Sequence, residues 1–374
     1  MLLQEEAVPA TAAPQGQPAT PVPQVPKAPP TESASGRIIR PEFTGSTREY
    51  FRLWVVNLLF TLVSFGLFSA WAKVRKKKYF YGNTRLDGDS LDYFGQPLAI
   101  LKGRVVAVAV LAVYAFATEI YPASQSYFWG AGLLLLPWLA ARSYTFNARN
   151  SAWRGVRFDF LASGSEAAKQ FLGRLVVVVV TAGLALPWFL ARIKSFVLRH
   201  QAFGVSPFEC VISARAYYGI YLRSAGLSIL LFVPVGALSA LFYFNRASVP
   251  FLPPWLIFAA PIVLTYLVYA VVHAYLQART GNLVWNSASA AGVRFESTLG
   301  AKDLAKLYLG NLIAIACSAG LLIPWAVVRT YRYRLDHFAL IADDDLVHEA
   351  NPALARVGAA GQELGDVLNL DLGL

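Results

Sequence analysis

Seven apolar stretches follow one another along the chain, and polar or proline-containing segments separate them. They cover residues 53–72, 105–121, 126–141, 171–191, 224–243, 252–276 and 307–328. Each stretch is close to the roughly 20 residues that an α-helix needs to cross the hydrocarbon core of a bilayer. The pattern therefore predicts an all-α polytopic membrane protein with about seven hydrophobic segments.

Three of these stretches belong to one repeated sequence pattern. Aligned on the glycines of GLFSAW at 66, GLALPW at 183 and GLLIPW at 320, the copies match without a gap. Charged and aromatic residues recur in register, and two further apolar stretches follow the first and second copies but not the third. The expected repeat units are residues 40–79, 157–196 and 294–333, with helix pairs at 105–141 and 224–276.

Each repeat unit carries signals for a helix, a break and a second helix. Ser46 and Glu49 have the spacing of a capping box that starts a helix. In the second and third copies a proline precedes the tryptophan, and proline is tolerated in a first helical turn but costs about 3 kcal/mol in a helix interior. We therefore expect a helix–break–helix unit in each copy, preceded by a short extended stretch.

A short polar segment after the first unit predicts a β-hairpin. Its Asp87–Gly88 pair lies between β-prone residues and fits a type I′ turn. Asp87, Asp89 and Asp92 do not have the spacing of a calcium-binding EF-hand loop, so a solvated turn is expected there. Small β-hairpin elements should accordingly lie on the cytoplasmic face of a helical protein.

Composition supports the membrane assignment. Of 374 residues, 56% are hydrophobic and 15% charged, whereas about a quarter of a soluble domain is charged. The net charge of +11 beside such apolar stretches indicates topogenic, lipid-facing charge rather than nucleic-acid binding. Cys210 and Cys317 are the only cysteines, and their spacing indicates neither a disulfide framework nor a zinc site. We expect no metal and no cofactor.

The two ends of the chain differ from the membrane domain, which we place at residues 37–341. Residues 1–36 contain eight prolines without periodicity and predict a disordered tail. Residues 342–374 hold seven acids and one base and predict an acidic disordered tail.

Two topologies compete. If all seven stretches cross, the 33 Lys and Arg residues divide into 19 inside and 14 outside, which is a weak positive-inside bias. If each repeat unit enters and returns to one face, only Arg246 lies outside and the division becomes 32 to 1. Charge thus favours re-entrant units, four spanning helices and cytoplasmic termini, although the apolar stretches are long enough to cross.

Polar residues at one repeat position are the candidate pathway. Arg174 lies inside an apolar stretch, where the other copies hold Asn57 and Asn311. An ionisable residue within the membrane is a functional hypothesis by default, but Arg174 is near enough to Lys169 to snorkel to the interface. These three residues form a polar pathway if the units meet around an axis.

A second set of residues fits the binding of lipid headgroups. Each second helix holds a tryptophan followed four residues later by an arginine, and the first copy adds three lysines. The set is Trp71, Arg75, Lys76, Lys77, Lys78, Trp188, Arg192, Trp325 and Arg329. We interpret the tryptophans and arginines as membrane anchors and the added lysines as a topogenic or lipid-binding extension.

Enzymatic machinery is not visible in the sequence. The four histidines are scattered, and there is no HExxH, GxSxG or Walker sequence and no pair of intramembrane carboxylates. We expect that the protein is not an enzyme.

Several segments resemble one known family. FGLFSAWAKVRKKKYFYGNTRLDG at 65–88 is the most specific, and LKGR, NSAWRGVRF and NSASAAGVRF follow it. Together they resemble the YjgN-like family of bacterial inner-membrane proteins, from about residue 37 to about 341. The resemblance implies a multi-pass protein of the bacterial plasma membrane and implies no activity or catalytic residue.

The leading functional hypothesis is transport or channel-like passage of a small solute or ion, because internal repeats and broken helices build such pathways. The alternative is a non-transporting envelope scaffold that binds anionic lipids or partner proteins. The expected partners are membrane lipids, mainly anionic, without nucleic acid, and a homo-oligomer is also considered.

Overall fold

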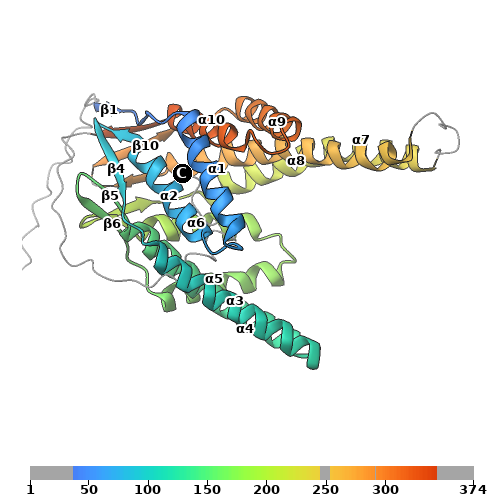
Figure 1. Cartoon of the computed structure of the whole chain (residues 1–374), viewed down its shortest axis with the longest axis horizontal. Helices are drawn as coiled ribbons and strands as arrows, with labels where there is room; N and C mark the ends of the chain where they lie inside the picture. The colour runs from blue at the N-terminus through green and yellow to red at the C-terminus, as the bar shows by residue number, and fades with distance from the viewer. Residues whose placement is uncertain (1–36, 245–252, 291, 343–374) are drawn as a thin grey trace, which may run out of the picture. The chain divides into compact units, whose positions relative to one another are not determined.

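The computed structural model describes residues 37–244, 253–290 and 292–342, and the structural statements that follow concern these residues (Figure 1). The predicted disordered tails lie outside them, apart from Ala342. The described helices are α1 Thr47–Val63, α2 Ser69–Gly82, α3 Pro97–Ile120, α4 Ser124–Arg149, α5 Gly164–Val180, α6 Leu186–Arg199, α7 Ala214–Phe244, α8 Pro254–Trp285, α9 Ala301–Cys317 and α10 Ile323–Asp336.

The described strands are short and lie between pairs of helices. They are β1 Arg37–Ile39, β2 Glu42–Phe43, β3 Thr84–Leu86, β4 Asp89–Tyr93, β5 Ser151–Trp153, β6 Val156–Phe160, β7 Gln201–Phe203, β8 Ser206–Cys210, β9 Ala288–Ala290, β10 Val293–Ser297 and β11 Phe338–Ala342. The chain therefore leaves a strand, forms two helices and returns to a strand, five times in succession.

The long helices agree with a membrane location. Within the described residues, α3, α7 and Ala259–Trp285 of α8 are long and apolar enough to cross a bilayer. Helix α4 is also long, but polar residues occupy both of its ends. The apolar stretches at 53–72, 171–191 and 307–328 are each divided between two shorter helices. The structure is thus mostly helical, with three helices of spanning character.

The all-α class is wrong in one respect, because the strands form a single sheet rather than separate small hairpins. Eleven strands pair antiparallel in the order β1-β11-β10-β9-β8-β7-β6-β5-β4-β3-β2. The predicted hairpin at Asp87–Gly88 is confirmed, with φ of 52° and 86° at its two turn residues. The local pattern predicted this hairpin but not the pairing of its strands with those of distant hairpins.

The two ends of the sheet are joined by a very short link. Strands β1 and β2 lie at opposite edges of the strand order, yet only Arg40 and Pro41 separate Ile39 from Glu42. Three residue steps span at most about 11 Å, because an extended chain covers roughly 3.3–3.6 Å per residue. The sheet must therefore curl until its edges lie close together.

Apolar side chains fill the inside of this curled sheet. Leu86 of β3 packs against a cluster that contains Ile39 and Leu340, at the β1–β11 edge. It also packs against a cluster of Trp153 and Phe203, from β5 and β7. One side chain thus contacts strands that are far apart in the strand order, which agrees with the curling that the short link requires.

The helices also pack in chain order. Each described helix packs against the next helix along the chain, and α10 packs against α1. The ten described helices therefore form a closed sequence of contacts, and the last pair rests on the first.

The turns inside the three short pairs α1–α2, α5–α6 and α9–α10 share one backbone conformation. Gly66, Gly183 and Gly320 have φ of 90°, 87° and 91°, and the residue before each glycine has φ near 50°. The glycine N–H donates to a carbonyl five residues earlier, at 2.7, 2.8 and 2.9 Å. A positive φ of this size favours glycine, which has no Cβ.

A hydroxyl group completes the hydrogen bonding of each of these turns. Ser64, Thr181 and Ser318 each accept a hydrogen bond from the backbone N–H four residues later, at 2.8, 3.1 and 3.0 Å. The tips are nevertheless apolar, and the side chain of Phe65 is 99% exposed. A turn that satisfies its own polar groups and exposes apolar side chains suits a hydrocarbon environment.

Polar side chains cap the helices that return to the sheet. The side-chain amides of Asn83 and Asn150 donate to the carbonyl four residues earlier, both at 2.8 Å. Nδ1 of His200 and Nδ1 of His337 lie at the same distance from the equivalent carbonyls. His200 and His337 therefore cap the C-terminal ends of α6 and α10.

We predict that the turn glycines stabilise the fold. Gly183→Ala should lower the free energy of unfolding by about 1–2 kcal/mol, because alanine is strained at positive φ. Gly173→Ala is the matched control, because no atom lies within 4 Å of a Cβ added at this helical glycine. Thermal unfolding of the purified protein in detergent measures both changes. Equal effects of the two substitutions would contradict the assignment of the turn.

We also predict that the ion pair between α4 and β6 stabilises the fold. Arg149 Nε donates to Asp159 Oδ1 at 2.7 Å, and the Asp159 side chain is only 9% exposed. Asp159→Ala should cost about 1–3 kcal/mol, because it removes a charged acceptor and leaves a partly buried guanidinium without it.

The matched control for this ion pair is Asp89→Ala. Asp89 binds Arg154 at 2.6 Å, but its side chain is 54% exposed. Exposed pairs contribute only about 0–1 kcal/mol, so the midpoint of thermal unfolding should change little. A larger loss for Asp89→Ala than for Asp159→Ala would contradict the prediction.

Candidate functional site

The predicted tryptophans and arginines occupy the same place in each short helix pair. Trp71, Trp188 and Trp325 lie in the first turn of α2, α6 and α10 and are half-buried. The arginine four residues later lies on the same face of its helix and is exposed. In the third pair the Arg329 guanidinium lies 5.0 Å from the centre of the Trp325 ring, a cation–π contact.

These arginines contact the polar residues that were predicted as a pathway. Nη1 of Arg329 donates to Oδ1 of the buried Asn311 at 3.3 Å. Nη1 of Arg75 makes a longer hydrogen bond of 3.5 Å to Oδ1 of the buried Asn57. The spacing is the same in both cases, because 18 residues separate the asparagine from the arginine across the turn.

Asn57, Arg174 and Asn311 are each buried or half-buried within their own helix pair. Among the described residues, no hydrogen bond or ion pair joins these three positions to one another. Asn311 uses its amide for a 2.9 Å hydrogen bond to Thr330 on the neighbouring helix α10. The structure therefore brings each pathway residue to the arginine of its own pair rather than to the other two.

The second pair differs from the other two because arginine occupies both positions. Arg174 replaces the asparagine, and Arg192 is the equivalent of Arg75 and Arg329. Nη1 of Arg174 is buried and has no hydrogen-bond partner among the described residues. Arg192 lies 18 residues after Arg174, the spacing at which the arginine contacts the asparagine in the other two pairs. This pair thus holds two positive charges where, in the other pairs, an arginine donates a hydrogen bond to a neutral asparagine.

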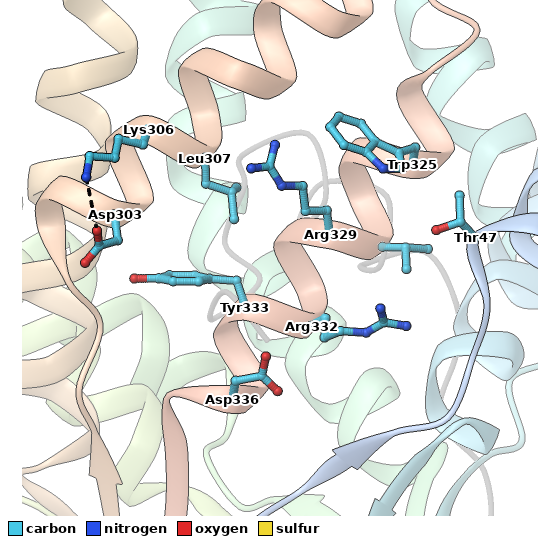
Figure 2. Close-up of a pocket in the computed structure, with 10 residues that line it drawn as sticks. Thr47, Asp303, Lys306, Leu307, Trp325, Arg329, Arg332, Tyr333 and Asp336 are labelled. Atoms are coloured by element: carbon cyan, nitrogen blue, oxygen red, sulfur yellow. Dashed lines mark ion pairs between the residues drawn. The ribbon is translucent and has the colours of Figure 1, made fainter.

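A cavity of about 400 Å³ opens beside the third pair, where α9 and α10 meet the start of α1 (Figure 2). Trp325 and Arg329, both predicted from the sequence, line it. The remaining lining residues are Thr47, Asp303, Lys306, Leu307, Val328, Arg332, Tyr333 and Asp336. Three bases and two acids therefore face one space next to a half-buried tryptophan.

Some of the charge in this cavity is already neutralised. Lys306 Nζ lies 3.8 Å from Asp303 Oδ1, an i,i+3 pair drawn as a dashed line in Figure 2. Arg332 donates to the backbone carbonyl of Gly45 at 3.1 Å. Sequence reasoning missed Arg332 because its partner lies 287 residues away. The YRYR segment around it was nevertheless a visible basic and aromatic signal.

The three added lysines of the first pair do not behave alike. Lys77 Nζ donates to Asn147 Oδ1 at 2.6 Å and lies 5.3 Å from the centre of the Tyr93 ring, so it lies against α4. Lys76 and Lys78, by contrast, are exposed.

The described residues contain no group of three or more His, Cys, Asp and Glu side chains arranged to hold a metal ion. Cys210 lies in β8, and burial raises the pKa of its thiol to about 11. At neutral pH this thiol is protonated and behaves as a small apolar side chain.

Comparison with known proteins gives partial relatives. The chain is 24% identical over 148 residues to the inner membrane protein YjgN of Salmonella typhimurium strain LT2, covering 38% of this chain and 37% of that protein. It is 29% identical over 127 residues to the inner membrane protein YjgN of Escherichia coli K12, covering 32% and 31%. The matches span about a third of each relative. No solved structure matches.

A match to a protein family covers far more of the chain. The DUF898 family, described as bacterial protein of unknown function, matches residues 39–367. This range contains all the described helices, and the resemblance to YjgN proteins that the sequence indicated is confirmed. The chain therefore belongs to the DUF898 family of bacterial proteins.

Proposed function

We propose that this integral membrane protein lies in the bacterial inner membrane and binds the headgroups of anionic phospholipids at its cytoplasmic face. The observation that carries the proposal is the repeated arrangement of an exposed arginine one helical turn beyond a half-buried tryptophan, in all three short helix pairs. The inner-membrane location is supported by the names of the YjgN relatives.

The orientation follows from the way the helix pairs return to the sheet. Strands that flank each short pair are neighbours in the sheet, so both ends of the pair lie on the sheet side. Helices α1, α5 and α9 have 17 residues each, or about 25 Å, less than the roughly 30 Å of the hydrocarbon core. We therefore propose that the short pairs are re-entrant and that α3, α4, α7 and α8 cross the membrane. This topology puts the sheet and nearly all Lys and Arg residues on one side of the membrane. By the positive-inside rule that side is the cytoplasm.

In this orientation the tryptophan and arginine of each unit have distinct roles. The tips reach into hydrocarbon, the tryptophan lies towards the polar boundary, and the arginine four residues later is level with the lipid phosphates. Each basic residue near an anionic surface contributes about 1 kcal/mol of attraction. Arg75, Arg192 and Arg329 with the exposed Lys76 and Lys78 together supply a substantial preference for anionic lipid.

The repeat itself is part of the proposal. The three short pairs share a capping or first-turn acid, a glycine turn with its hydroxyl, and the Trp–Arg spacing. We regard them as three versions of one membrane-anchoring unit. The long pairs α3–α4 and α7–α8 then serve as the spanning elements between them.

Transport of a small solute or ion is the second candidate. The closed order of helix contacts, in which α10 packs against α1, favours it because such an arrangement surrounds a common axis. Two observations weigh against it. The polar residues pair within their own units, and apolar side chains fill the curled sheet. Passage of an ion or small solute through purified protein in liposomes, lost in Asn57→Leu and Asn311→Leu variants, would favour transport over headgroup binding.

We predict that the exposed arginines determine lipid preference. A variant with Arg75→Gln, Arg192→Gln and Arg329→Gln should retain less phosphatidylglycerol than the wild type after purification from mixed-lipid membranes. The matched control removes the same charge from strands of the sheet, with Arg85→Gln, Arg157→Gln and Arg294→Gln. Quantitative mass spectrometry of the co-purified lipid measures both variants.

The expected loss is selective. The helix variant should lose phosphatidylglycerol but not phosphatidylethanolamine, while the strand variant resembles the wild type. An equal loss in both variants would mean that net charge alone attracts lipid and would sink the assignment of these arginines.

We further predict that the second short pair returns to the cytoplasm. An alkaline phosphatase fusion after Gln201, in β7, should be inactive, and a fluorescent-protein fusion there should fluoresce. The control is a fusion after Tyr121, between α3 and α4, where alkaline phosphatase should be active. Phosphatase activity after Gln201 would rule out the re-entrant topology.

A further inference from the structure

The second short pair lacks the internal hydrogen bond that its two counterparts make. In the first and third pairs the asparagine Oδ1 accepts from the arginine Nη1, at 3.5 and 3.3 Å. The second pair holds arginine at both positions, Arg174 and Arg192. Within the described residues, no hydrogen bond or ion pair joins either guanidinium to a protein oxygen, and Nη1 of Arg174 is buried.

The protein supplies little negative charge that could reach these two groups. Helices α5 and α6 together carry five Lys and Arg residues and one acid, Glu166. The Glu166 carboxylate lies 3.2 Å from Nε2 of His200, near the sheet, two helical turns before Arg174. On the neighbouring elements α4 and β6, the carboxylate of Asp159 is already paired with Arg149.

Two adjacent guanidinium groups without an acceptor are an unfavourable arrangement unless an anion lies between them. Repulsion and the removal of water both oppose it, and a buried charge that lacks a partner is costly. A guanidinium presents donors in a planar fork that matches the oxygen atoms of phosphate. A phosphate group placed between Arg174 and Arg192 would supply the acceptors that the asparagine supplies in the other pairs.

We infer that the second helix pair is a binding site for a phosphate group, held between Arg174 of α5 and Arg192 of α6. The site rests on the proposed function, because the headgroup of an anionic phospholipid is one source of such a phosphate. A free phosphate or phosphomonoester from the cytoplasm is the other. Both sources place the same chemical group between the same two side chains.

The depth of the two arginines agrees with a phosphate at the membrane boundary. Arg174 is ten residues after the first residue of α5, or about 15 Å along the helix. Arg192 is seven residues before the last residue of α6, or about 10 Å from the sheet end. Phe171 and Phe189, whose ring centres are 5.3 Å apart, join the same two helices. The two charges therefore lie within about one helical turn of each other in height on packed helices.

The decisive variant is Arg174→Asn, because it converts the second pair into the arrangement of the first and third. This variant should fold, and the side-chain oxygen of the new asparagine should accept a hydrogen bond from Arg192. The experiment measures the midpoint of thermal unfolding of the full-length protein in a neutral detergent. One titration adds inorganic phosphate in a sulfate-free buffer at constant ionic strength. The other adds phosphatidylglycerol, and phosphatidylcholine is the neutral reference.

For the wild type we expect a saturable rise in the unfolding midpoint with one of the two probes. Arg174→Asn and Arg192→Gln should weaken the apparent affinity for that probe on the order of tenfold or more, because each removes one charge-assisted partner. Without any probe, Arg174→Asn should be more stable than the wild type, because it relieves the repulsion. Response to phosphatidylglycerol alone identifies a lipid headgroup, and response to inorganic phosphate identifies a soluble ligand.

An Arg75→Gln, Arg329→Gln variant separates this inference from the proposed function, because it removes the exposed arginines of the first and third pairs and leaves the second pair intact. If it loses phosphatidylglycerol while Arg174→Asn keeps the full saturable response, the phosphate site is wrong and the proposed function stands. If it retains lipid while Arg174→Asn loses a response to inorganic phosphate, the phosphate site stands and the proposed function fails. If neither probe changes the unfolding of the wild type, Arg174 only extends towards the interface and the inference is overturned.

Discussion

Every helix pair in the described chain begins and ends on strands of one sheet, and this connection constrains the rest of the structure. Strand pairs such as β2–β3, β6–β7 and β10–β11 hold the two ends of a short helix pair side by side. The helices between them must turn back, whatever their length. The glycine turns at the tips are the local solution, because they reverse the chain while leaving few polar groups for a membrane to solvate.

The same connection places charge and aromatic side chains in a band. Since each returning helix ends on the sheet, its tryptophan and arginine stand at a fixed distance from the strands. The three units differ mainly in what faces this arginine: an asparagine, a second arginine, or an asparagine beside an open cavity. One scaffold thereby surrounds the same arginine position with three different environments.

The sequence predicted the helices well because their signals are local. The capping box at Ser46 and the turn glycines act within a few residues, and the structure has helix starts and breaks at these places. The sheet was missed because its strands have two to five residues and pair with strands from other hairpins, about 40 residues or more away. The contact between Asn311 and Arg329 was also missed, although the constant 18-residue spacing across the turn was present in all three copies.

The link of Arg40 and Pro41 has a consequence for how the molecule assembles. Strand β1 pairs with β11, which follows it by about 300 residues, so its partner emerges last during synthesis. Until then β1 and β10 present unpaired edges, and such non-local pairing forms slowly. Insertion of the helices can proceed pair by pair, but closure of the sheet waits for Phe338–Ala342. A chain that stops before β11, the last described strand, would therefore leave β1 without the strand that it pairs with.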